Sequence, residues 1–158
     1  MVTVEPASPG EADAVADLWV ALARSQRRYG SHLYAEANHD AIRESMARHA
    51  ADGQLTVARD GDDIVGFVRY GVERGPLAQD ATRGVVRDLY VVPERRREGI
   101  GSRLLDTVEA GLDVDVVALE AMATNADAAR FYERRGYRPH RIEFELEVES
   151  DKRPRGNR

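Results

Sequence analysis

The fold is decided by the stretch Arg95-Arg96-Arg97-Glu98-Gly99-Ile100-Gly101-Ser102, which separates an apolar run at residues 85–92 from an apolar-periodic run that begins at Ile100. The first run predicts a strand and the second predicts a helix. Two glycines one residue apart at such a junction leave the first N–H groups of the helix unpaired, at the positive end of its dipole. Neighbouring guanidinium groups bind phosphate oxygens and stay charged at any working pH. The stretch therefore predicts a pyrophosphate site.

Two other phosphate-binding turns fit the sequence poorly. A P-loop requires a lysine after its second glycine, whereas the only lysine of the chain is Lys152, near the C-terminus. A dinucleotide-binding turn requires Gly-x-Gly-x-x-Gly and an acidic residue about 20 positions later. Glu120 lies near that distance, but Leu104 replaces the third glycine. A nucleoside triphosphatase is thus disfavoured, and a dinucleotide-dependent enzyme is the weaker alternative.

Two motifs together resemble the GNAT superfamily of acetyl-CoA-dependent N-acetyltransferases. The first is Arg96-x-x-Gly99-x-Gly101 after the strand Asp88-Leu89-Tyr90-Val91-Val92-Pro93, and the second is Asn125-x-x-Ala128-x-x-Phe131-Tyr132-x-x-x-Gly136-Tyr137. The close resemblance covers residues 85–139, and a looser agreement in the order of elements extends over nearly the whole chain. Glu98 departs from the pattern, because many relatives place a basic or neutral residue inside this turn. We expect its carboxylate to point to solvent.

The resemblance implies acetyl-CoA as the acetyl donor. It places the pyrophosphate on the backbone of the turn, the acyl end against the preceding strand, and Asn125 both at the start of the last helix and beside the cofactor. Arg95 is either one more phosphate ligand or part of a solvated charge cluster. The implied cofactor-binding residues are Leu89, Tyr90, Val91, Arg96, Arg97, Gly99, Ile100, Gly101, Ser102, Asn125 and Tyr132.

Two side chains are candidate catalytic groups. The resemblance places Tyr132 near the cofactor sulfur as a general acid, although an aromatic pair such as Phe131-Tyr132 in a helix is often part of a core. Asp88 is a carboxylate inside an otherwise apolar strand, where an unpaired buried charge is costly. Its partner is either an arginine, Arg69 or Arg87, or the substrate amine.

The expected reaction is a direct attack of a primary amine on the thioester carbonyl. A free backbone N–H of the strand would stabilise the charge that develops on the carbonyl oxygen. An alkyl ammonium, with a pKa of about 10.4, must first lose a proton. Asp88, Glu120 or an ordered water is the candidate acceptor of that proton.

The composition excludes several other classes of protein. The chain has no cysteine, which excludes disulfides, thiolate metal sites and a cysteine acyl-enzyme. A formal net charge of −5 argues against nucleic acid as the main partner. Its four histidines lack the spacing of metal ligands, so no metal is predicted. No apolar run approaches the length of a membrane span, and the acidic N-terminus is unlike a signal peptide, so we expect a cytoplasmic protein without a membrane partner.

The order of the elements predicts an α/β (α+β) fold. We expect one domain at residues 1–149 and a flexible tail at residues 150–158. A single mixed, mostly antiparallel sheet of about six to seven strands, flanked by about four helices, fits the pattern, and the resemblance adds central parallel strands that splay apart. Strands are predicted at residues 2–5, 54–59, 64–72, 85–92, 114–119 and 142–148. Helices are predicted after the capping box at residues 8–11 and at residues 40–51, 99–110 and 125–135.

The leading function is transfer of the acetyl group of acetyl-CoA to a primary amine of a small molecule or a peptide. The alternative is a non-catalytic acetyl-CoA-binding sensor or interaction module. The acceptor stays open, because the acidic balance suits a cationic amine whereas the arginines within residues 26–29 suit a carboxylated one. A homodimer through the last strand or an exposed sheet edge is a further expectation.

Overall fold

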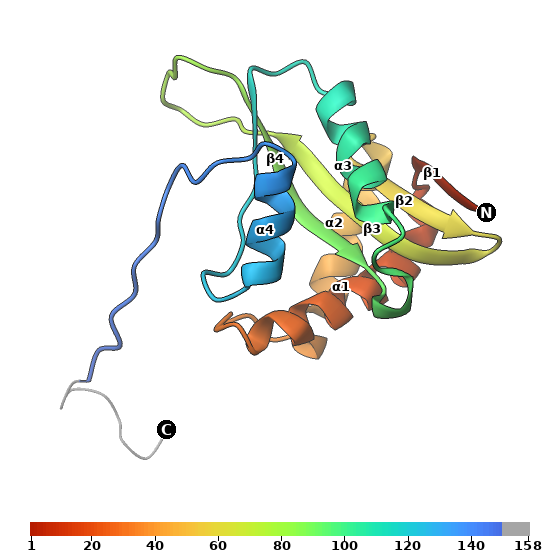
Figure 1. Ribbon diagram of the computed structural model, residues 1–158. Coiled ribbons are helices and arrows are strands. Elements are labelled where there is room, and N and C mark those ends of the chain that lie inside the picture. The colour runs from red at the N-terminus through yellow and green to blue at the C-terminus, as the bar shows by residue number, and fades with distance from the viewer. Residues whose placement is uncertain (150–158) are drawn as a thin grey trace. The chain divides into compact units, whose positions relative to one another are not determined.

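The first 125 residues of the chain form a five-stranded sheet with amphipathic helices packed on it (Figure 1). The computed structural model describes residues 1–149, and the chain divides into two units, Met1–Asn125 and Ala126–Arg158. The first unit contains, in chain order, β1 (Val2–Pro6), η1 (Pro9–Glu11), α1 (Ala12–Arg27), η2 (Glu36–Asn38), α2 (His39–Ala51), β2 (Leu55–Asp60), β3 (Asp63–Val72), β4 (Arg83–Val91), η3 (Pro93–Arg95), α3 (Ile100–Gly111) and β5 (Val116–Ala118).

The sheet has the strand order β1-β2-β3-β4-β5. Strands β1 to β4 pair antiparallel with their neighbours, and β5 lies parallel to β4 because the helical crossover α3 returns the chain in the same direction. The predicted class, a mixed and mostly antiparallel sheet flanked by helices, is confirmed.

Helices cover both faces of the sheet. On one face, α1 and α2 bury Trp19 and Met46 against Leu55, Phe67 and other core residues. On the other face, α3 packs its buried Leu104 beside Gly66, the neighbour of Phe67 on β3. Because successive residues of a strand point to opposite faces, β3 is covered on both sides. Figure 1 shows α3 in front of the sheet and α2 behind it.

The second unit contains α4 (Ala126–Arg134), which ends in a tight turn. Gly136 has a φ of 96°, and the N–H groups of Gly136 and Tyr137 donate to the carbonyls of Glu133 and Tyr132, each at 3.0 Å. This is the Schellman arrangement, in which a glycine takes the left-handed conformation at little cost. This turn therefore explains why the second motif has a glycine at position 136.

The prediction of a final strand at residues 142–148 is wrong, and the described sheet has five strands instead of six to seven. This segment has no regular secondary structure, and Ile142, Phe144 and Leu146 are 72%, 88% and 85% exposed. Alternation of apolar and acidic residues shows which face a strand would bury, but a strand also needs a neighbour with which to pair. The predicted tail at residues 150–158 lies outside the described residues.

Among residues 1–149, we find no helix that combines the length and the apolar character needed to span a membrane.

An ion pair joins the start of the first helical layer to the sheet. Ser8 and Glu11 form the predicted capping box, and the Glu11 carboxylate also accepts hydrogen bonds from Arg59 on β2. The bond from Arg59 lowers the pKa of Glu11 from its ordinary value of 4.5 to about 2. The ionised Glu11 carboxylate therefore stabilises the folded protein relative to the unfolded chain.

We predict that Glu11→Gln makes the free energy of unfolding less dependent on pH in the acidic range. The depressed pKa of Glu11 gives the wild type a stabilisation that is complete above pH 4.5 and is lost as the pH falls toward 2. Urea denaturation at a series of pH values should show a difference between wild type and variant that is largest at neutral pH and shrinks below pH 4.5.

Glu36→Gln is the matched control, because Glu36 also pairs with an arginine, Arg24, but both side chains are more than 60% exposed. Solvent screening should keep its effect small at every pH. A Glu11→Gln difference that stays constant down to pH 2.5 would contradict the assigned role.

Candidate functional site

The site begins where two parallel strands separate. In the first unit, β4 pairs with β5 at Arg83, Gly84 and Val85, whereas it continues to pair with β3 as far as Val91. Residues 86–91 of β4 therefore have no strand beside them on the β5 side within that unit. The splayed parallel strands that the resemblance implied are present.

The backbone groups on this open edge are those of alternate residues. The N–H of Val92 donates to the Val65 carbonyl on β3 at 2.9 Å, and the direction of N–H groups alternates along an antiparallel strand. The N–H groups of Val91 and Leu89 therefore point away from β3, toward the open edge. In agreement, the Val91 carbonyl also points away from β3 and accepts a hydrogen bond from Arg96 Nε at 2.9 Å.

The side chain of Tyr90, by contrast, belongs to the core. It is 7% exposed, and its ring centroid lies 6.5 Å from that of Phe67. Of the three strand residues that the sequence assigned to the cofactor, Leu89 and Val91 present backbone donors to the open edge, and Tyr90 supports them from behind.

The turn after β4 has the backbone of an anion-binding nest. Arg97 and Gly99 have φ angles of 66° and 80°, and Glu98 between them has no positive φ. Alternating signs of φ turn successive N–H groups toward one point. A Cβ placed on Gly99 would meet nothing within 4 Å, so there is open space beside the turn at this residue. The left-handed conformation of Arg97 could not be inferred from its residue type, since few non-glycine residues adopt it.

The N-terminus of α3 faces the same turn. Arg103 donates its N–H to the Gly99 carbonyl at 3.1 Å, and among the described residues no side chain caps the start of α3. The N–H groups of Ile100, Gly101 and Ser102 precede this bond and are free to meet an anion. Ile100 is 2% exposed, so its side chain anchors the helix and only its backbone is available to a ligand.

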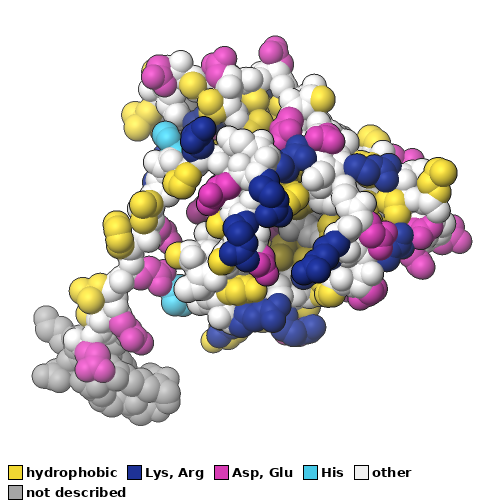
Figure 2. Space-filling view, viewed as in Figure 1, with side chains coloured by type: hydrophobic (Ala, Val, Ile, Leu, Met, Phe, Trp, Pro, Cys, Tyr) yellow, Lys and Arg dark blue, Asp and Glu magenta, His cyan; other side chains and the backbone are white. Residues whose placement is uncertain are grey.

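Basic side chains, dark blue in Figure 2, are exposed on the face of the molecule shown there. The three arginines before the turn have three different environments. Arg95 is held by Asp60 and Glu98, at 2.8 and 3.1 Å, which favours a structural role over phosphate binding. The same contact occupies Glu98 and partly neutralises the acid that departs from the family pattern. Arg96 lies 5.5 Å from the ring centroid of Tyr90 and is tied to Val91, whereas Arg97 is exposed on the turn itself.

Asp88 has a partner within the sheet. Its Oδ2 accepts a hydrogen bond from Arg69 Nε at 2.6 Å, and the two side chains are 13% and 12% exposed. Of the two readings that the sequence left open, the structure contains the pairing with Arg69. Glu120, two residues beyond β5, is exposed.

Tyr132 lies on α4 in the second unit, in contact with two aromatic rings. Its centroid is 5.5 Å from that of Phe131 and 6.1 Å from that of Tyr137. Burial raises the pKa of Tyr132, so the phenol stays protonated at neutral pH and can donate a hydrogen bond.

The connection between α1 and η2 lies beside the segment that follows β5. Thr124 Oγ1 donates to the Tyr29 carbonyl at 3.1 Å, and Gly30 approaches Met122. Asn125 closes the same segment with an N–H bond to the Met122 carbonyl at 2.9 Å. Since parallel strands end at the same side of a sheet, this connection borders the open ends of β4 and β5. Sequence patterns carried no signal for this contact.

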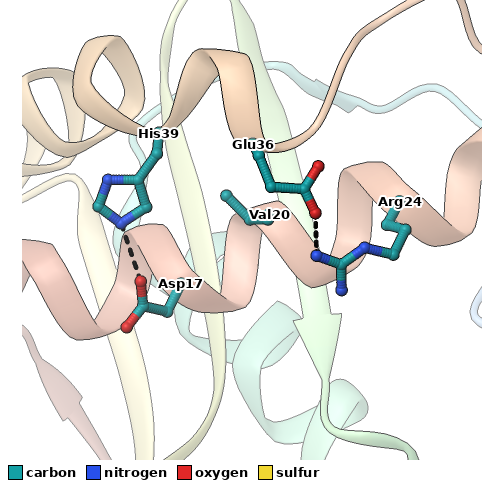
Figure 3. Close-up of a pocket in the computed structure, with 5 residues that line it drawn as sticks. All are labelled: Asp17, Val20, Arg24, Glu36 and His39. Carbon is teal, nitrogen blue, oxygen red and sulfur yellow. Dashed lines mark hydrogen bonds and ion pairs between the residues drawn. The ribbon is translucent and has the colours of Figure 1, made fainter.

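A separate groove of about 500 Å³ lies between α1 and the start of α2. Figure 3 shows His39 directed at Asp17 and Glu36 directed at Arg24, on either side of Val20. His39 Nε2 lies 2.8 Å from Asp17 Oδ1, and this hydrogen bond raises the pKa of His39. Each acid is thus already paired with a basic side chain, which makes the groove a poor receptor for an amine.

Comparisons with known proteins place the chain in a family. Residues 19–137 match the profile of the acetyltransferase (GNAT) family. This match spans most of the sheet and the site, and the chain therefore belongs to that family. No curated protein matches the sequence.

Solved structures share the fold at low sequence identity. A GCN5-related N-acetyltransferase from Ralstonia eutropha JMP134 is 24% identical, with a TM-score of 0.70, over 94% of this chain and 99% of that one. A mutant of the protein BH1408 from Bacillus halodurans is 18% identical, with a TM-score of 0.78, over 94% and 99% of the two chains. The aminoglycoside N-acetyltransferase AAC(6′)-Iy, in complex with CoA, is 12% identical, with a TM-score of 0.68, over 93% and 95%.

Proposed function

We propose that this protein transfers the acetyl group of acetyl-CoA directly to a primary amine of a small molecule or peptide. The observation that carries the proposal is the position of the open nest at residues 97–101 directly after a strand with unpaired N–H groups. One end of this arrangement suits a pyrophosphate, and the other suits an acyl oxygen. The family membership and the CoA found in AAC(6′)-Iy support the choice of donor.

The residues present fit a CoA thioester. The backbone of Gly99, Ile100, Gly101 and Ser102 would bind the pyrophosphate, with Arg96 and Arg97 adding charge at the rim. Leu89 and Val91 would bind the acyl end through their N–H groups, and Asn125 would contact the cofactor from the segment after β5. The donor supplies an activated acetyl group, so the protein needs to orient the groups and move protons.

Charge stabilisation comes from the open edge of β4. As an amine approaches, negative charge develops on the carbonyl oxygen, and an N–H group of Leu89 or Val91 would stabilise it. A fixed backbone donor is effective because it needs no reorganisation during the reaction.

The proton of the incoming ammonium needs an acceptor. Glu120 is exposed near the end of β5, and we propose that it, or water that it orders, takes this proton. Asp88 is the other carboxylate that the sequence offered for this step. Its nearly buried ion pair with Arg69 favours a structural role over proton transfer.

Tyr132 would assist the leaving thiolate. A phenol with a raised pKa is a weaker acid than a thiol, so complete proton transfer is uphill, and a hydrogen bond from the hydroxyl to the sulfur is the favoured form of assistance. The packing of Tyr132 against Phe131 and Tyr137 holds the ring in place for this task.

The proposed reaction is tested by incubating the protein with acetyl-CoA and a panel of primary amines that includes polyamines, aminoglycosides, amino acids and peptide N-termini. Release of free CoA that requires both the protein and one of the amines supports an enzyme. Tight binding of acetyl-CoA without amine-dependent release would favour the sensor. Binding of a nicotinamide dinucleotide instead of acetyl-CoA would contradict both.

We predict that Gly99→Ala weakens the binding of acetyl-CoA by about tenfold or more, because alanine is strained in the left-handed conformation on which the nest depends, and a tenfold change is worth about 1.4 kcal/mol. The positive φ makes an alanine strained by roughly 1–2 kcal/mol, so the fold should lose little more than that. Isothermal titration calorimetry and thermal unfolding measure the two effects.

Gly53→Ala is the matched control. Gly53 has a φ of 72° and also has open space where a Cβ would lie, but it is in the turn between α2 and β2. It should show the same loss of stability with unchanged affinity for acetyl-CoA. Native affinity in a folded Gly99→Ala variant would remove the pyrophosphate from this turn.

We predict that Tyr132→Phe lowers kcat by about 10²-fold and leaves the affinity for acetyl-CoA nearly unchanged, because only the hydroxyl is lost. Tyr137→Phe removes a hydroxyl from the neighbouring ring in the same cluster and should keep its turnover. Steady-state kinetics of both variants with the best amine of the panel decide the role. Equal turnover in Tyr132→Phe and wild type would exclude Tyr132 from the mechanism.

A further inference from the structure

A bulge interrupts β4 directly after its last pair with β5. Arg69 on β3 is opposite Asp88, but the next residue, Tyr70, is opposite Val86, so Arg87 is an extra residue without a partner on β3. The last β4–β5 pair is Val85 with Ala118. Bulges bend a strand and redirect the groups that follow. The bulge thus lies between the closed part of the sheet and the open edge.

A nearly buried ion pair closes the bulge on the side of the open edge. Arg69 and Asp88 lie opposite each other, joined by the 2.6 Å hydrogen bond from Nε to Oδ2. Arg69 Nη1 also donates to Ser45 Oγ on α2 at 2.8 Å. Loss of one member of such a pair leaves an uncompensated charge in a poorly solvated place. The ion pair therefore stabilises the observed register of β3 against β4 relative to registers shifted by one residue.

The register decides which N–H groups reach the open edge. A slip by one residue reverses the direction of every following side chain and N–H group. In the observed register, Val92 donates to β3, and the N–H groups of Leu89 and Val91 face the open edge. If the extra residue were accommodated at another position of β4, the N–H groups of Tyr90 and Val92 would face the open edge instead.

We propose that Arg69 and Asp88 are positioning residues: their ion pair, anchored to Ser45 on α2, holds the bulge at Arg87 and so aims the N–H groups of Leu89 and Val91 at the acyl oxygen. This inference rests on the proposed acetyl transfer. It assigns Asp88 a role that acts through the backbone of β4, in place of direct contact with the substrate amine.

Kinetics of Asp88→Asn, Asp88→Ala and Arg69→Ala separate the two roles. If the pair positions β4, both alanine variants lose about 10²-fold in kcat, as expected for a misplaced donor, with the affinity for acetyl-CoA nearly unchanged. The double alanine variant then loses little more than either single one, since the residues act as a unit. Asp88→Asn keeps a hydrogen-bonding group of the same shape, so it recovers much of the loss, and its pH profile of kcat/KM keeps the wild-type form.

The opposite pattern overturns the proposal. If Asp88 accepts the proton, Asp88→Asn is as inactive as Asp88→Ala, the acidic limb of the pH profile disappears, and the losses in the double variant add. Glu73→Ala is the matched control, because Glu73 also pairs with an arginine of β4, Arg83, at 3.2 Å, on the other side of the bulge. It should leave kcat unchanged.

Amide hydrogen exchange gives a readout that does not depend on activity. The wild type should protect the amides of Tyr90 and Val92 and leave those of Leu89 and Val91 fast, because only the first two face β3. Asp88→Ala should weaken or invert this alternation in a protein whose α1 and α2 amides remain protected. Unchanged alternation overturns the positioning role. Altered alternation in a protein that acetylates none of the amines would instead support the ion pair's control of register while the proposed function fails.

Discussion

The structure depends on the separation of β4 from β5 after Val85. An unpaired strand edge is usually a liability, because its N–H and C=O groups attract other strands. Here the edge lies between two strands of the same sheet, and the crossover α3 begins just beyond its end. One continuous segment, residues 86–102, therefore supplies two sets of unpaired N–H groups, from the strand edge and from the helix start. A thioester with a distant diphosphate needs donors at two such places.

Much of the proposed site consists of backbone groups, so a residue can belong to it without offering a side chain to the ligand. Tyr90 and Ile100 are buried, so in the proposed site their side chains support the backbone and are not available to a ligand. The arginine run is likewise divided, since Arg95 is bound to Asp60 and Glu98 whereas Arg96 spans the end of the strand. A motif can thus be recognised at a position whose side chain never meets the ligand. Substitution of the side chain at such a position therefore tests packing more directly than it tests ligand binding.

The sequence predicts correctly those elements whose pattern depends only on residues close along the chain. The helix predicted at residues 40–51 is α2, His39–Ala51, and the strand predicted at residues 85–92 is β4, Arg83–Val91. In α2 the apolar side chains repeat with the period of a helix, and β4 contains a short apolar run; both are local properties of the sequence. The segment at residues 142–148 has an equally regular alternation, but it forms no strand. Strand formation requires a partner, and no local pattern supplies one.

By itself, the sequence determined the order and type of most elements, the glycine turn after β4 and the family to which both motifs point. These features depend on neighbours within a few residues. Only the tertiary structure decided that Asp88 pairs with Arg69, that Arg87 is an extra residue in β4, and that Leu89 and Val91 direct their N–H groups to the open edge. The reason is that register, bulges and ion pairs arise between strands that are distant along the chain, where many pairings are compatible with one pattern and packing selects among them.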